Sequence, residues 1–113
     1  WFRKDEDGKW LWPGFGDNSR PIEWALRRVN GEIGALDGLS GHIPEPGDLN
    51  LEGLDISEKQ LAALFELDPD AWGREAALTE EYFAQFGDKV PEALHQQLWY
   101  LRERIAKAQD AAE

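Results

Sequence analysis

The sequence has no cysteine and no methionine. Without cysteine, disulfide bonds, thiolate zinc sites, iron–sulfur clusters and cysteine nucleophiles are all excluded. No apolar run reaches the about 20 residues that a membrane-spanning helix needs, and the charged N-terminal stretch does not resemble a signal peptide. Because the first residue is Trp1 rather than methionine, we expect a segment of a longer protein. The absence of cysteine fits a reducing compartment, and we expect a cytoplasmic location.

Basic residues are scarce and unevenly placed. The chain has 12 Lys and Arg against 23 Asp and Glu, a formal net charge of −11. Residues 1–30 carry six basic and five acidic side chains, whereas residues 31–113 carry six basic and eighteen acidic ones. An acidic body repels nucleic-acid phosphates and anionic lipid headgroups. We therefore expect no nucleic-acid partner and no membrane partner.

The length of 113 residues is enough for one domain with one hydrophobic core. Hydrophobic residues make up 42% and charged residues 31% of the chain, which is a globular composition. Six of the thirteen aromatic residues lie within the first 24 positions: Trp1, Phe2, Trp10, Trp12, Phe15 and Trp24. We therefore divide the single domain, residues 1–113, into an aromatic head (1–30), a connector (31–56) and an acidic helical tail (57–113).

The aromatic head has the pattern of a hairpin followed by a short helix. Asp7-Gly8 favours a tight turn between the apolar runs at 1–2 and 10–12, because glycine adopts positive φ without a Cβ clash. Pro13-Gly14 ends the second run. Residues of helix-capping type at 17–19 precede an apolar series with helical spacing, Ile22, Ala25, Leu26 and Val29. This spacing predicts an amphipathic helix to about Asn30, ended by Gly31.

The connector holds six of the eleven glycines, so we expect extended chain with short strand pieces at 42–43 and 49–51. Three helices follow, starting at the capping box Ser57–Gln60, at Asp68-Pro69 and at Pro91. The apolar spacing of the last helix extends for less than three heptads, which favours packing on a neighbouring helix over a coiled coil. We expect its alanine-rich end, residues 106–113, to fray. The predicted class is α+β, mostly α: an aromatic hairpin and loop, a short helix, a Gly-rich connector and three packed C-terminal helices.

No catalytic or metal-binding motif is present. His42 and His95 have no second histidine at ligand spacing, and no serine lies in a nucleophile turn. The acidic pair Glu80-Glu81 has nothing apolar placed to raise its pKa, so a solvated helix face is the better interpretation. Neither GxxxxGK[ST] nor GxGxxG occurs, so the chain has no phosphate-binding loop. We expect the chain on its own to catalyse nothing.

The aromatic head suggests a binding slot for a planar base. If the hairpin and loop bring Phe2 and Phe15 to face each other about 7 Å apart, the two rings can stack on both sides of a heterocycle. Trp10 would then close one edge. The amide of Asn18 supplies one donor and one acceptor, which suits guanine O6 and N1–H, while adenine presents the opposite pair. A simple aromatic mini-core is the competing interpretation of the same residues.

At these residues the sequence resembles a known family. WFRKDEDGKWLWPGFGDNSR, residues 1–20, and IEWALRRV, residues 22–29, resemble the C-terminal signature of GTP-dependent phosphoenolpyruvate carboxykinase. HIPEPGDLNLEGL at 42–54, DPDAW at 68–72 and the closing helix to about Lys107 are similar more loosely. The resemblance implies a parent lyase that converts oxaloacetate and GTP to phosphoenolpyruvate, GDP and carbon dioxide. It also implies a divalent metal, usually manganese, and a second Mg²⁺ or Mn²⁺ on the nucleotide, all with ligands outside this chain.

The resemblance also implies a guanine site in the aromatic head. By position, the stacking pair is Phe2 and Phe15, the edge ring is Trp10 and the amide is Asn18, with backbone around Pro13 and Gly14 lining the slot. The family usually has phenylalanine where this chain has Trp10.

The resemblance places the phosphate loop, the metal ligands and the oxaloacetate-binding arginines in the missing N-terminal body. The isolated chain is then a guanine-recognising part without catalytic residues. The alternative is a non-enzymatic helical interaction module whose aromatic face docks on another protein.

Overall fold

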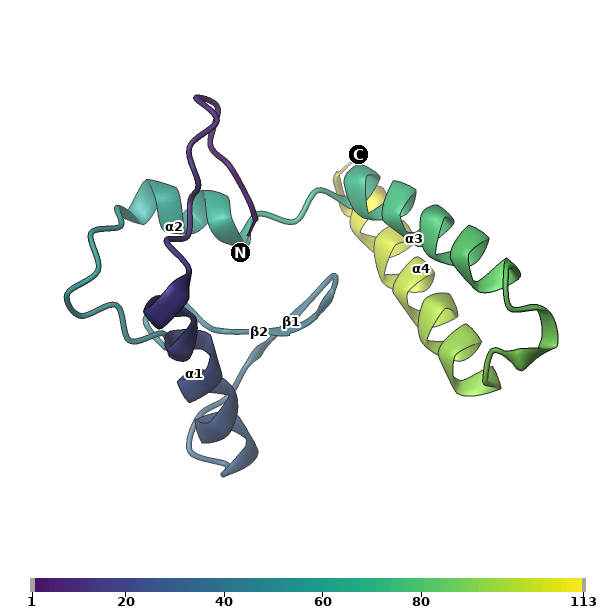
Figure 1. Ribbon diagram of the computed structural model, residues 1–113, viewed down its shortest axis with the longest axis horizontal. Coiled ribbons are helices and arrows are strands. Elements are labelled where there is room, and N and C mark those ends of the chain that lie inside the picture. Colours follow the sequence, from purple (N-terminus) through teal and green to yellow (C-terminus); the bar gives the residue numbers. More distant parts are fainter. Residues whose placement is uncertain (1, 113) are drawn as a thin grey trace. The chain divides into compact units, whose positions relative to one another are not determined.

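The computed structural model describes residues 2–112; Trp1, which we assigned to the first apolar run, and Glu113 lie outside the described residues. Along the chain the elements are η1 (Phe15–Asn18), α1 (Ser19–Val29), β1 (Leu36–Gly38), β2 (Gly41–Ile43), α2 (Glu58–Phe65), α3 (Pro69–Ala84), η2 (Gly87–Lys89) and α4 (Glu92–Ala112). Most of this chain is helical and β1 and β2 form a small sheet, so the predicted class is confirmed (Figure 1).

The chain forms two compact units. The first comprises the described residues up to Asp37 together with His42–Glu66, and the second comprises Gly38–Gly41 and the residues from Leu67 onward. The grouping of α2 therefore differs from our expectation that all three C-terminal helices pack together, because α2 belongs to the first unit. Its C-terminal end explains this: Glu66 is extended, and the Arg3 guanidinium donates to the carbonyl oxygens of Leu64 and Glu66.

The predicted hairpin is present in the first unit. Lys4 and Trp10 form an antiparallel bridge, and the Leu11 amide donates to the Arg3 carbonyl at 2.9 Å. At the tip, Gly8 has φ +78°, the left-handed conformation that the Asp-Gly pattern predicts. The carboxylate of Asp5 accepts from two tip amides and fixes the turn. Leu11 at the base of the hairpin is buried, which anchors the hairpin in the unit.

The helix predicted to run to about Asn30 is α1, and it ends as expected. The amide of Gly31, at φ +75°, donates to the Arg28 carbonyl at 3.1 Å, which closes the last turn. The apolar series of α1 is exposed in the part of the chain that the structure describes: Ile22 at 56%, Leu26 at 60% and Val29 at 84%.

The connector contains the two short strands. The strand predicted at 42–43 is β2, paired with β1, whereas residues 49–51 form no strand and the prediction there is wrong. Leu49 is instead buried in the first unit as an irregular segment, so its apolar character reflects packing rather than strand pairing. The capping box of α2 is confirmed: Ser57 Oγ accepts from the Gln60 amide at 3.2 Å, and Gln60 Oε1 accepts from the Ser57 amide at 2.9 Å.

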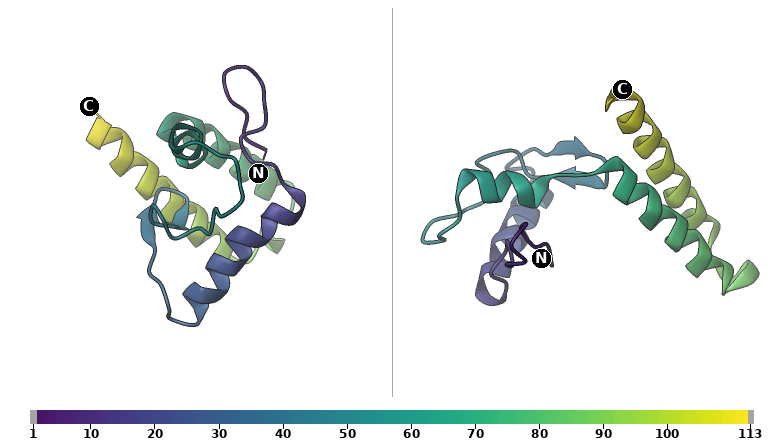
Figure 2. Two further views of the ribbon diagram at one scale, coloured as in Figure 1. Left: turned by 90° about the vertical axis from the view of Figure 1, so that its left-hand side faces the viewer. Right: turned by 90° about the horizontal axis from the view of Figure 1, so that it is seen from above.

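In the second unit α3 and α4 run side by side in opposite directions (Figure 1, Figure 2). Their buried contacts are Ala76, Leu98 and Ile105, with Leu39, Trp72, Phe83 and Leu101 packed around them. The predicted packing of the last helix on its neighbour is thus confirmed. The expected fraying is wrong as far as Ala112, because α4 stays helical and Gln109 donates to the Asp70 carboxylate at 2.7 Å.

Candidate functional site

One surface groove in the first unit collects the residues predicted from the aromatic head. It has a volume of about 510 Å³. Its lining residues are Phe2, Trp10, Trp12, Pro13, Gly14, Phe15 and Asn18. All six predicted residues are therefore brought together, although they lie up to sixteen positions apart in the sequence. A seventh, Trp12, was not predicted.

The phenylalanines of the groove face solvent. Phe2 is 82% exposed and Phe15 is 95% exposed, while the edge residue Trp10 is 56% exposed. Trp10 meets Phe2 edge to face, with ring centroids 6.2 Å apart and an interplanar angle of 71°. Covering exposed apolar surface lowers the free energy of the system. The exposed aromatic faces of the groove therefore favour a flat apolar ligand.

A strained turn projects Phe15 outward. Gly14 has φ +75° and ψ −158°, a conformation that glycine adopts readily, and Phe15 follows with φ +51°. Left-handed backbone costs a residue with a Cβ about 1–2 kcal/mol, and a bulky residue rarely adopts it. The 95% exposure of Phe15 offers no burial that would offset this strain. Strain without a packing benefit is typical of functional positions.

Asn18 ends η1, and its side chain does not cap α1 as its residue type suggested. Instead its Oδ1 accepts a hydrogen bond from the Trp12 indole Nε1–H at 2.9 Å. Trp12 is only 5% exposed, so this contact holds the amide at the inner wall of the groove. A sequence signal for Trp12 was available. Its indole N–H can only donate a hydrogen bond, and the amide acceptor of Asn18 lies in the same short segment.

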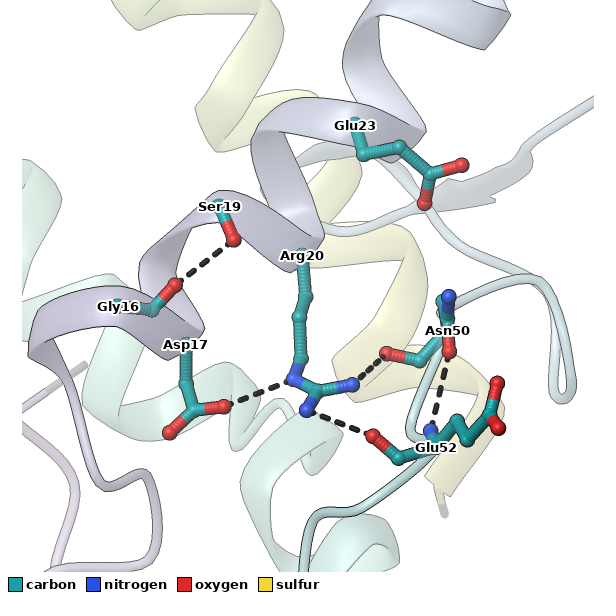
Figure 3. Close-up of a pocket in the computed structure, with 7 residues that line it drawn as sticks. All are labelled: Gly16, Asp17, Ser19, Arg20, Glu23, Asn50 and Glu52. Atoms are coloured by element: carbon teal, nitrogen blue, oxygen red, sulfur yellow. Dashed lines mark hydrogen bonds and ion pairs between the residues drawn. The ribbon is translucent and has the colours of Figure 1, made fainter.

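Arg20 fixes the segment that carries Phe15 and Asn18. Its guanidinium donates to the Asp17 carboxylate at 2.9 Å, to the Asn50 carbonyl at 2.6 Å and to the Glu52 carbonyl at 2.9 Å (Figure 3). The planar guanidinium thus joins η1 to residues 50–52 of the connector, which lie thirty or more positions away. It lines a hollow of about 350 Å³ together with the acidic side chains of Asp17, Glu23 and Glu52. Sequence reasoning did not find this residue.

The histidines and the acidic pair, to which the sequence analysis assigned no catalytic role, make structural contacts. His42 Nδ1 lies 2.9 Å from the Asp37 carboxylate beside the small sheet, and His95 meets Phe83 edge to face. The hydrogen bond from Arg102, and then its charge, lower the pKa of Glu80 below its ordinary value. Within residues 2–112, no group of three or more His, Asp or Glu side chains is arranged to hold a metal ion.

Comparison with known proteins identifies the family. The family model of the phosphoenolpyruvate carboxykinase C-terminal P-loop domain matches the sequence over residues 1–104. The chain belongs to this family. The family resemblance predicted from residues 1–29 is thereby confirmed. As the sequence contains no GxxxxGK[ST], the phosphoenolpyruvate carboxykinase portion present here does not include a phosphate-binding loop of that pattern.

Similar proteins carry the name phosphoenolpyruvate carboxykinase (GTP). The chain is 43% identical over 105 residues to the protein of Renibacterium salmoninarum, covering 93% of this chain and 17% of that protein. It is 42% identical over 106 residues to the protein of Arthrobacter sp. strain FB24, covering 94% of this chain and 17% of that protein. It is 42% identical over 106 residues to the protein of Chlamydia caviae, covering 93% of this chain and 18% of that protein. The chain thus spans less than a fifth of the length of these relatives. No helix in residues 2–112 is long and apolar enough to cross a membrane.

Proposed function

We propose that this chain is the guanine-recognising part of a GTP-dependent phosphoenolpyruvate carboxykinase and has no catalytic activity by itself. The whole enzyme would convert oxaloacetate and GTP to phosphoenolpyruvate, GDP and carbon dioxide. The observation that supports this function is the groove in the first unit, where the exposed rings of Phe2 and Phe15 lie with the amide of Asn18.

The chemistry of the groove suits a base rather than a phosphate. Stacking on an aromatic ring contributes about 1–3 kcal/mol per base, and a purine between Phe2 and Phe15 would cover both exposed faces. Trp10, held against Phe2, would limit the slot at one edge. The amide of Asn18 would distinguish guanine from adenine, because the two bases present donor and acceptor in opposite order.

The metal ions that the resemblance implies do not fit the residues present. The described residues hold no cluster of three carboxylate or imidazole groups placed to bind an ion. Phosphoryl transfer depends on metal ions and charged groups placed around the phosphates. We therefore assign no chemical step to this chain, and a manganese preference and a cytoplasmic location remain predictions for the whole enzyme, whose N-terminal body would be the partner of this chain.

Titration of the ¹⁵N-labelled chain with GDP and with ADP tests this function. Without contacts to the phosphates we expect weak binding, with a Kd of about 1 mM or above, which corresponds to about −4 kcal/mol. GDP should shift amide resonances of residues 14–18 and the Trp10 indole resonance, while ADP should shift them much less. Phe2→Ala and Phe15→Ala should each remove the GDP response.

Phe86→Ala is the matched control, because Phe86 is also an exposed phenylalanine, at 45%, but lies between α3 and η2 in the second unit. It should leave the GDP response unchanged. A well-dispersed spectrum that responds to neither nucleotide would contradict guanine recognition. That result would favour the alternative, in which the exposed aromatic face docks on another protein surface.

A further inference from the structure

We propose that Trp12 is a positioning residue that fixes the orientation of the Asn18 carboxamide and thereby determines which purine the groove accepts. This inference rests on the proposed function of the groove. It goes beyond the stacking and base-bonding residues, because Trp12 acts on the base only through Asn18. The observation behind it is the hydrogen bond of 2.9 Å from the Trp12 indole Nε1–H to Asn18 Oδ1.

The chemistry of this hydrogen bond allows only one orientation of the amide. The indole N–H is a donor without acceptor capacity, so it pairs with Oδ1 and not with the Nδ2 amino group. Turning the carboxamide of Asn18 by half a revolution would place two donors against each other and would leave the buried indole N–H without a partner. The orientation that the structure shows is therefore the one that the Trp12 contact favours.

A fixed amide can discriminate where a rotating one cannot. Guanine presents the O6 acceptor beside the N1–H donor, and adenine presents an amino donor beside the N1 acceptor. A freely rotating carboxamide satisfies either pair by turning over. With Oδ1 of Asn18 held by Trp12, Nδ2 remains the donor for O6, and the second lone pair of Oδ1 remains available to N1–H. Adenine would face donor against donor.

The packing of Trp12 suits this function. Trp12 is 5% exposed, next to the buried Leu11, and borders the same hollow as Pro21, Leu49, Leu64 and Phe65. The other indole of the groove, Trp10, is 56% exposed. One tryptophan of the groove is thus held by the interior of the first unit, while the other lies at the open edge. Only the first is placed to transmit a fixed direction to Asn18.

The test measures the ratio of GDP to ADP affinity by NMR titration of the 113-residue chain. It compares the wild type with the variants Trp12→Phe and Trp24→Phe. Trp12→Phe removes the N–H and keeps an aromatic ring. Trp24→Phe is the matched control, because the half-buried Trp24 indole N–H has no hydrogen-bond partner among the described residues. We expect Trp12→Phe to lower the GDP-to-ADP ratio by about fivefold or more, as loss of one hydrogen bond would do, and Trp24→Phe to leave it unchanged.

A second variant covers the case in which Trp12→Phe disturbs the buried core. Replacing Trp12 by 3-benzothienylalanine keeps the bicyclic shape and exchanges the N–H for sulfur, which cannot donate. The same loss of discrimination is expected. In the ligand-free protein, both replacements should also shift the side-chain amide resonances of Asn18, which Trp24→Phe should not move.

The outcomes separate this inference from the proposed function. A wild-type preference for GDP that survives in the benzothienyl variant would overturn the positioning by Trp12 and leave guanine recognition intact. A wild-type chain that binds both nucleotides equally, or neither, would overturn the proposed function and this inference with it. A preference that falls in both Trp12 variants and stays in Trp24→Phe supports the inference.

Discussion

Lys4 and Trp10 pair across the N-terminal hairpin, and the Lys4 ammonium lies 4.3 Å from the centroid of the Trp10 ring. The two residues therefore form a cation–π contact in addition to their backbone bridge. Trp10 also meets the ring of Phe2 edge to face, with the ring centroids 6.2 Å apart. The exposed edge residue of the groove is thus restrained by two different neighbours.

Replacement of Lys4 should weaken this restraint. Lys4→Gln removes the cation but keeps the backbone bridge, and an exposed cation–π contact contributes about 0.5–1 kcal/mol. We expect the Trp10 indole resonance to shift and GDP affinity to fall by about two- to fivefold. Lys9→Gln, in the same hairpin, is the control. Equal effects of the two variants on the Trp10 resonance would show that net charge, not the ring contact, is responsible.

The strained backbone of Phe15 predicts a variant that is more stable and less functional. Phe15→Asn replaces a residue at φ +51° by one that tolerates left-handed backbone, and little burial is lost because Phe15 is 95% exposed. We expect hydrogen exchange to report stabilisation of the first unit by about 1 kcal/mol, together with loss of the GDP response. Unchanged or faster exchange would mean that the turn carries no strain at this position.

The Arg20 contacts predict a specific sensitivity to lysine. Arg20→Lys keeps the charge but cannot reach Asp17 and the carbonyls of Asn50 and Glu52 together, so we expect a local loss of about 2 kcal/mol. Faster hydrogen exchange should appear at residues 15–18 and 50–54. Arg27→Lys is the control, because among residues 2–112 Arg27 makes only surface ion pairs, 3.8 Å from Glu23 and 3.5 Å from Glu32. Similar exchange in both variants would contradict a joining function of Arg20.

The Glu80–Arg102 pair predicts a pH-dependent contribution to the pairing of α3 and α4. Arg102 bonds Glu80 through both carboxylate oxygens, at 3.1 and 2.6 Å, and lowers the pKa of Glu80 below its ordinary value of 4.5. Because the folded-state pKa is the lower one, the stabilisation is fully present above pH 4.5 and is lost as the pH falls through the folded-state pKa.

Thermal unfolding of the second unit, followed by circular dichroism, measures this contribution. Glu80→Gln should lower the Tm relative to wild type at neutral pH, and the difference should disappear well below pH 4.5. Glu81→Gln changes the neighbouring exposed carboxylate and should have little effect at either pH. A Tm difference for Glu80→Gln that persists in acid would contradict the ionic origin of the effect.

Local sequence rules predicted much of the secondary structure. The tip at Gly8, the capping box at Ser57, the start of α3 at Pro69 and the end of α1 before Gly31 depend on a few adjacent residues, whose backbone preferences act in any context. The strand predicted at 49–51 was wrong because the apolar residues Leu49 and Leu51 give the same short signal for burial as for strand pairing. The helical end of α4 was missed because the Gln109–Asp70 contact joins residues that lie 39 positions apart in the sequence.

The local turns and caps, the acidic charge of the tail and the family follow from residue types and their spacing along the chain. Three features depend on packing in space: α2 lies in the first unit, Arg20 joins η1 to the connector, and Trp12 holds the amide of Asn18. Residue types alone do not predict these features, because a hydrogen bond depends on direction as well as on residue type. The direction of a side chain follows from packing between segments whose separation in the sequence gives no measure of their distance in space.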